Sequence, residues 1–199
     1  MSVSSAERLL ARAATESDRL RRHLLVAAAL RAALEHAPIV VGGTAEEYHA
    51  AADYHETDLD LCGPLTTTDR ASMRTLGFRL RGRHWYHDAS RVAVEFPDTG
   101  IDGDEGRVER VRVGEGTALV IGVDDLYLDR LMQATAPLQP EGSIEFASAL
   151  ALAAGTADRI DRRYVLARIR DIRRTNPGLA RVMRQLDSKI RRRIRSALG

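Results

Sequence analysis

The chain has 199 residues, of which 44% are hydrophobic and 29% charged, and this balance excludes an intrinsically disordered protein. The only cysteine, Cys62, excludes an intramolecular disulfide and a Cys-x-x-Cys metal site. The longest apolar run, residues 24–34, contains Arg31 and is too short to cross a bilayer, and no signal peptide is visible. We therefore expect a cytoplasmic protein without a membrane partner.

The net charge of +2 conceals an uneven distribution along the chain. Residues 162–199 hold twelve arginines and Lys189 against two aspartates, a local charge of +11, which leaves −9 for residues 1–161. The acidic and basic parts are therefore expected to have different partners.

The residue pattern in the first third of the chain predicts helices on either side of short strands. Apolar residues at helical spacing over 5–36 indicate one or two helices that cover a face of a sheet, and residues 39–41 indicate a short buried strand. Thr44 with Glu47 three residues later is a capping-box pattern, which predicts a helix from Thr44 to about Tyr54. A strand is then expected over residues 58–62.

The rest of the chain predicts one more helix, then strands, then helices. Residues 66–76 indicate a helix closed by Gly77. Alternation predicts a mostly antiparallel meander with strands over 78–87, 91–96, 107–113 and 118–121. Helices are expected over 123–134, about 144–154, 158–175 and 179–198. This order predicts an α+β domain over residues 1–135 and a helical C-terminal extension over 136–199 with basic last helices.

Two aspartates on one predicted strand indicate a metal site. Asp58 and Asp60 are two residues apart, so their carboxylates share one face of the strand and repel each other unless a cation lies between them. Mg²⁺ takes one or two protein carboxylates together with substrate phosphates. Gly42 and Gly43 lack side chains, so the backbone can approach a phosphate closely where a helix begins.

A two-metal site needs a third carboxylate, for which a neighbouring strand is the natural place. Glu95 interrupts the apolar run Val92-Ala-Val-Glu-Phe, where an acidic side chain is costly unless it is paired. Asp88 and Asp98 are the fallback candidates, closer to turns. The competing interpretations are a solvated acidic pair on an edge strand and an exposed Glu95.

The Gly42-Gly43-Thr44 turn, a helix and the Asp58-Leu-Asp60 strand together resemble the GG[ST] and DxD signature of the DNA polymerase β superfamily of nucleotidyltransferases. The form VVGGTA is most similar to AbiEii-like and related minimal nucleotidyltransferases of toxin–antitoxin systems, over roughly residues 38–135. The resemblance implies a polymerase-β-like fold, a mixed, mostly antiparallel sheet with flanking helices. It also implies a cognate antitoxin or toxin protein as a partner.

The resemblance also assigns roles to single residues. It implies that Asp58, Asp60 and Glu95 hold two Mg²⁺ ions and that Gly42, Gly43 and Thr44 cradle the triphosphate. The run Val123-Asp-Asp-Leu-Tyr-Leu-Asp-Arg130 is similar to a later helix of the family that carries an acidic-Leu motif. Arg130 stands where the family often has lysine and is expected to contact the triphosphate; the competing interpretation is a surface arginine.

The leading hypothesis is a metal-dependent transfer of a nucleoside monophosphate from ATP or another NTP to a hydroxyl of RNA, such as a tRNA 3′ end. The alternatives are AMP transfer to a protein, and a catalytically degenerate binding module, because the family usually has Asp where this chain has Glu95. The basic segment 162–199 is interpreted either as a solvated helical face or as an RNA-binding surface. The cluster His84-Trp85-Tyr86-His87 is suited to base stacking, or to placing Trp85 in the core.

Overall fold

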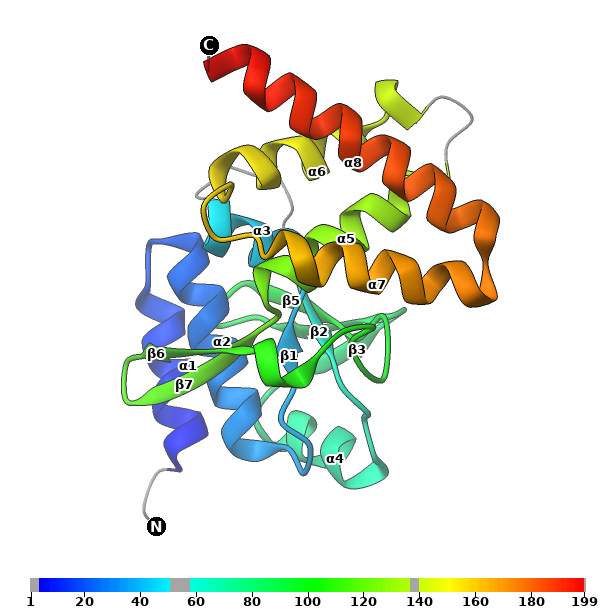
Figure 1. Ribbon diagram of the computed structural model, residues 1–199. Helices are drawn as coiled ribbons and strands as arrows, with labels where there is room; N and C mark the ends of the chain where they lie inside the picture. Colours follow the sequence, from blue (N-terminus) through cyan, green and yellow to red (C-terminus); the bar gives the residue numbers. More distant parts are fainter. Residues whose placement is uncertain (1–3, 51–57, 137–139, 199) are drawn as a thin grey trace. The chain divides into compact units, whose positions relative to one another are not determined.

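A computed structural model describes residues 4–50, 58–136 and 140–198, and the chain forms two compact units (Figure 1). The first comprises the chain up to Tyr48 and from Asp58 to Gly122. The second comprises everything from Val123 onward, with His49 and Ala50 at the end of a helix that begins in the first unit. Helices and a mixed sheet confirm the predicted α+β class.

The first unit contains all the described strands. Its helices are α1 Ser5–Thr15, α2 Arg19–Ala33, α3 Gly42–Ala50 and α4 Thr67–Thr75, with a short 3₁₀ turn η1 at Glu105–Arg107. Its strands are β1 Ile39–Val40, β2 Asp58–Cys62, β3 Arg79–Arg81, β4 His84–His87, β5 Val92–Glu95, β6 Glu109–Val113 and β7 Gly116–Val120. Of the one or two helices predicted over 5–36, the structure has two, α1 and α2, which lie side by side (Figure 1) with α2 against β7.

The strand order is β3-β4-β5-β2-β1-β7-β6. β5 runs parallel to β2 and β7 parallel to β1, while the remaining neighbours are antiparallel. The expected single meander is therefore wrong: β3–β5 and β6–β7 flank opposite sides of the β2–β1 centre. The interpretation of the Asp pair as part of an edge strand is also wrong, because β2 lies between β5 and β1.

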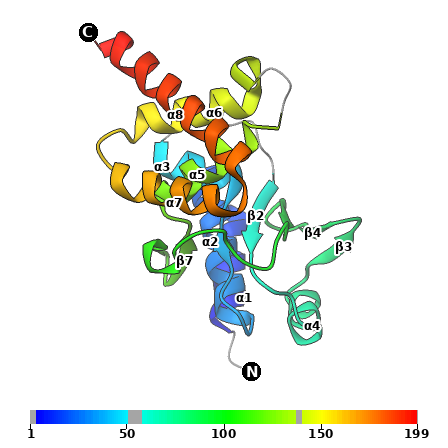
Figure 2. The ribbon, with the colours of Figure 1, turned by 45° about the vertical axis from the view of Figure 1, so that its right-hand side comes forward.

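Two other predictions for this unit need correction. The alternating run 78–87 is not one strand, because Gly82 at φ +61° turns the chain between β3 and β4, a hairpin visible in Figure 2. Thr44 is not a helix cap, because α3 already begins at Gly42. The predicted end of this helix near Tyr54 lies outside the described residues.

The described residues of the second unit form helices and their connections, with no strand. It contains α5 Val123–Gln133, η2 Pro140–Gly142, α6 Ile144–Gly155, α7 Arg162–Thr175 and α8 Pro177–Leu198. The unit begins before residue 135, the predicted domain boundary, because the apolar side of α5 packs against α6, α7 and α8. No helix among the described residues is both long and apolar enough to span a membrane.

A buried ion pair ties α5, α7 and α8 together. Asp187 of α8 is 1% exposed and receives hydrogen bonds from the Arg162 guanidinium of α7 at 2.6 and 2.7 Å and from the Tyr127 hydroxyl of α5 at 2.9 Å. Burial and the neighbouring carboxylate raise the pKa of Tyr127, so its hydroxyl stays a donor. The Asp187 carboxylate thus accepts hydrogen bonds from side chains of two other helices and links α5 and α7 to α8.

Candidate functional site

The three predicted carboxylates lie on one face of two neighbouring strands. Asp60 of β2 is the register partner of Glu95 of β5, and Asp58 is that of Ala93. Because alternate residues share a face, Asp58, Asp60 and Glu95 all project from the same side of the sheet. The opposite side is apolar core, with Leu59 and Val94 fully buried. The prediction that Glu95 occupies a strand beside the Asp pair is confirmed.

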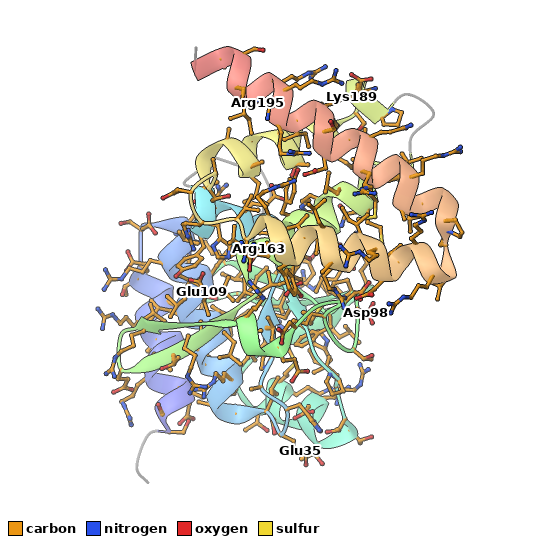
Figure 3. The ribbon with its side chains drawn as sticks, in the orientation of Figure 1. Glu35, Asp98, Glu109, Arg163, Lys189 and Arg195 are labelled. Atoms are coloured by element: carbon orange, nitrogen blue, oxygen red, sulfur yellow. The ribbon has the colours of Figure 1, made fainter. Side chains whose placement is uncertain are left out.

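The fallback carboxylates lie outside the strands β2 and β5. Asp88 forms an ion pair with Arg79 of β3. Asp98, labelled in Figure 3, is exposed in the turn after β5, where its carbonyl accepts a hydrogen bond from the Gly63 N–H. Both are therefore held in turn or hairpin structure.

The Gly-Gly turn is built against Asp60. The Val41 N–H donates to the Asp60 carbonyl at 3.0 Å, which fixes the turn between β1 and α3 beside β2. Gly42 has φ +63°, and a Cβ there would lie 2.2 Å from Oδ2 of Asp60. Only glycine therefore fits both the backbone conformation and the space next to the carboxylate.

A histidine that the sequence suggested only for base stacking stands between two of the carboxylates. Nε2 of His84, on β4, lies 3.2 Å from Oδ2 of Asp58 and 3.2 Å from Oε2 of Glu95. This nitrogen atom is buried, yet no group among the described residues forms a hydrogen bond of good geometry with it. Nε of Arg83 lies 3.2 Å from the same Glu95 oxygen. The side chain of Glu95 is only 15% exposed, so the interpretation of an exposed strand residue is wrong.

Thr44 contacts a buried histidine that the sequence analysis did not identify. Its hydroxyl lies 2.9 Å from Nδ1 of His23 in α2, and the exposed fractions of both residues are 3%. Burial, with the positive charges of Arg19 and Arg22, lowers the pKa of His23 to about 4. The signal in the sequence was a histidine at the start of the apolar run 24–34. His23 is neutral at pH 7 and holds the first turn of α3 through Thr44.

We expect this histidine to make folding stability depend on pH. The unfolded chain binds a proton at His23 near pH 6.5 and the folded chain only near pH 4, so stability is complete above pH 6.5 and falls as the pH drops toward 4. The shift corresponds to about 3 kcal/mol. Urea unfolding of His23→Gln between pH 4.5 and 7 should show a flatter pH dependence than the wild type. His36→Gln, which changes an exposed imidazole, is the control; equal slopes in His23→Gln and the wild type would contradict the assignment.

Space is available beside Asp58. Asp58 lines a surface groove of about 400 Å³ together with parts of β4 and β5, formed by Tyr86, His87, Asp88, Arg91, Val92 and Ala93. Trp85 does not line it, because its side chain is in the core at 2% exposed, which confirms the core interpretation of this residue. Asp58, with its side chain 39% exposed, is accessible to a ligand.

The predicted triphosphate contact Arg130 belongs to the second unit. It is buried in α5 and its guanidinium donates to Gln133 at 2.6 Å. Asp124 and Asp125 lie in the first turn of this helix and contact the start of α7: Asp124 accepts the Asp161 N–H and Asp125 the Tyr164 hydroxyl. The role of Arg130 stays a prediction.

A second group of potential metal ligands is a helix cap. Glu35, His36 and Asp69 place ligand atoms within 4.8 Å of one another. Asp69 is fully buried, and its two carboxylate oxygens accept the backbone N–H groups of Glu35 and Thr66 in the capping box of α4. Hydrogen bonds to the ionised carboxylate lower the pKa of Asp69 despite its burial, which opposes them. This group explains the start of α4.

No protein-family model, curated protein or solved structure matches the chain. The candidate site is therefore defined by its own geometry: Asp58, Asp60 and Glu95 gathered on one face, Gly42 against Asp60, and His84 between two carboxylates.

Proposed function

We propose that the chain is a magnesium-dependent nucleotidyltransferase of the polymerase-β type, which transfers a nucleoside monophosphate from an NTP to a hydroxyl acceptor. One observation carries the proposal: the Asp60–Glu95 register puts three carboxylates on one sheet face while Gly42 brings the turn before α3 against Asp60. Carboxylates that share one sheet face favour positive charge beside them, and a helix start next to them attracts phosphate.

The residues present fit a hard cation with a bound triphosphate. Nε2 of His84 lies 3.2 Å from oxygens of both Asp58 and Glu95, so the imidazole belongs to the same group of polar side chains. At Gly42 the missing side chain lets the backbone approach the Asp60 carboxylate, whose Oδ2 would lie 2.2 Å from a Cβ at this position. Asp58, Asp60 and Glu95 would hold Mg²⁺, which supplies polarisation of the α-phosphate and neutralisation of the leaving pyrophosphate.

The chain's own groups would orient the reactants. The turn at Gly42 and Gly43 would hold the phosphates at the start of α3, with Thr44 fixing that turn through His23. In the transfer, the acceptor oxygen forms a bond to the α-phosphorus, the bond to the β-phosphate oxygen breaks and pyrophosphate leaves. Glu95 would receive the acceptor proton, because it is the carboxylate on the strand farther from the turn.

RNA is the acceptor that the charge distribution favours. The basic segment 162–199 carries +11, and its arginines attract a polyanion, whereas the strand-bearing part carries the acidic site. A tRNA 3′ end offers a terminal hydroxyl on a flexible single strand. A toxin–antitoxin or related defence role, with a cognate protein partner, belongs to the same proposal.

A second candidate function is a nucleotidyltransferase fold that has become a binding module. The specific observation in its favour is that Arg83 and His84 already lie 3.2 Å from Glu95, so basic side chains of the chain itself already contact this carboxylate. The third possibility, AMP transfer to a protein hydroxyl, uses the same donor site.

Label transfer decides among these functions. The protein is incubated with each α-labelled NTP, Mg²⁺, total RNA and an acceptor lysate. We expect label in RNA, and its loss when EDTA removes the metal, because three adjacent carboxylates cannot bind a triphosphate without it. Label in protein alone would select AMP transfer. Absence of label together with absence of Mg²⁺-dependent triphosphate binding by calorimetry would contradict the transferase proposal and favour the binding module.

A further inference from the structure

The second unit contains a basic groove between α7 and α8. It has a volume of about 810 Å³ and is lined by one stripe of each helix near the turn that joins them: Leu166, Ile169, Arg170, Arg173, Pro177, Gly178, Ala180, Arg181, Arg184, Gln185 and Ser188. Both ribbon views show the two helices joined at this turn (Figures 1 and 2). Four of the lining residues are arginines and none is acidic.

Among the described residues, no carboxylate forms an ion pair with the four arginines that line the groove. Arg170, Arg173, Arg181 and Arg184 are exposed, and within the part of the chain that the structure describes none of them forms an ion pair. The neighbouring arginines differ: Arg162 and Arg191 are held by Asp187, and Arg174 by Asp171. The groove therefore concentrates four uncompensated guanidinium groups.

The spacing of these groups suits a chain of phosphates. Arg170 and Arg173, like Arg181 and Arg184, are three residues apart, so each pair lies on one helix face as neighbours about 5–6 Å apart at Cβ. Guanidinium groups bind phosphate oxygens through two parallel hydrogen bonds. Two such pairs on facing helices can grip a backbone from both sides.

The floor of the groove argues against an apolar protein helix as the occupant. Ile169 and Ala180 are 1% and 2% exposed, so their apolar surface is already used in packing within the unit. An amphipathic helix would find little further apolar area to bury. The lining also has no aromatic ring on which bases could stack. Charge is thus the main attraction that the groove offers to a ligand. Contacts of this kind with phosphate do not distinguish one base from another.

We propose that the α7–α8 groove binds the phosphate backbone of single-stranded RNA without regard to sequence. The inference deepens the proposed function, on which it rests for the identity of RNA as acceptor. Phosphate contacts release counterions, so the logarithm of the association constant should fall linearly with the logarithm of salt concentration, by about 0.7 per contact for a single strand.

The test is fluorescence anisotropy of the full chain with a labelled ten-nucleotide RNA, from 50 to 300 mM KCl, with EDTA and without NTP. The groove variant is Arg173→Gln/Arg181→Gln. The control is Arg163→Gln/Arg195→Gln, which also removes one exposed arginine from each helix, at positions labelled in Figure 3 that do not line the groove. Circular dichroism checks that all variants keep the helical content of the wild type.

We expect the groove variant to bind about 10- to 30-fold more weakly at 0.1 M salt, with a slope shallower by about 1.4. The control should lose less than about threefold, and decauridylate and a mixed sequence should bind alike. Equal losses in the two variants, or no RNA binding by the wild type, would overturn the inference. The inference would also be overturned if a glutamate-rich helical peptide bound through Arg173 and Arg181 and RNA did not bind.

The two proposals fail separately. RNA binding is measured without metal or nucleotide and should survive Asp58→Asn/Asp60→Asn, whereas label transfer should not. Groove-dependent RNA binding without label transfer would count against the transferase alone.

Discussion

Asp58→Asn/Asp60→Asn should abolish nucleotide transfer without lowering stability. The two carboxylates share a sheet face with Glu95, so removing two negative charges relieves repulsion that offsets the weakened contact between Asp58 and His84, and the isosteric amides keep the packing of β2. Losing the metal ligands costs several kcal/mol of transition-state stabilisation, a rate loss of at least about 10³-fold. Label transfer from an NTP to RNA measures the rate, and urea unfolding measures the stability.

Asp98→Asn is the control for this pair. Asp98 is exposed in the turn after β5, away from the carboxylate face, and its substitution should leave transfer unchanged. Unchanged transfer in the double variant would remove these aspartates from the mechanism. Loss of transfer together with a large loss of stability would instead indicate a structural role for the pair.

Gly42→Ala should damage the site by displacing Asp60. The new methyl group would lie 2.2 Å from Oδ2 and 3.0 Å from Cγ of Asp60, so the carboxylate must move. A displacement of about 1 Å costs roughly 10²-fold in rate. The left-handed backbone at φ +63° adds about 1–2 kcal/mol of destabilisation for a residue with a Cβ. Label transfer and urea unfolding together measure both effects.

Gly82→Ala is the control that separates the backbone strain of a Cβ at positive φ from the collision with Asp60. Gly82 has nearly the same backbone angle, φ +61°, but an added Cβ there would have nothing within 4 Å. It should therefore show the backbone cost alone and keep full activity. In an Asp60→Ala background the extra destabilisation by Gly42→Ala should shrink toward the Gly82→Ala value, because Oδ2 and Cγ, the two closest atoms, are gone and only Cβ at 3.1 Å remains. If Gly42→Ala matches Gly82→Ala in both stability and activity, the close approach to Asp60 has no functional importance.

The residues that sequence reasoning located well are those whose local pattern determines their place. Alternation in Asp58–Cys62 predicted both the strand and the shared face of its aspartates, and the break in the apolar run at Glu95 pointed to a strand beside them. Thr44 was misassigned as a cap because Thr44 and Glu47 match the local pattern of a capping box. In the structure, α3 starts two residues earlier, at Gly42. His84 was misjudged for a different reason: its neighbours Asp58 and Glu95 come from two other strands.

Local periodicity and charge were enough to predict the α+β class, the strand that carries the Asp pair and the concentration of arginine in residues 162–199, because these features belong to short runs of residues. Only the tertiary structure decided that β2 lies between β5 and β1, that Gly42 abuts Asp60 and that four arginines of α7 and α8 line one groove. Strand order and helix pairing depend on contacts between residues distant in the chain, which local periodicity does not encode.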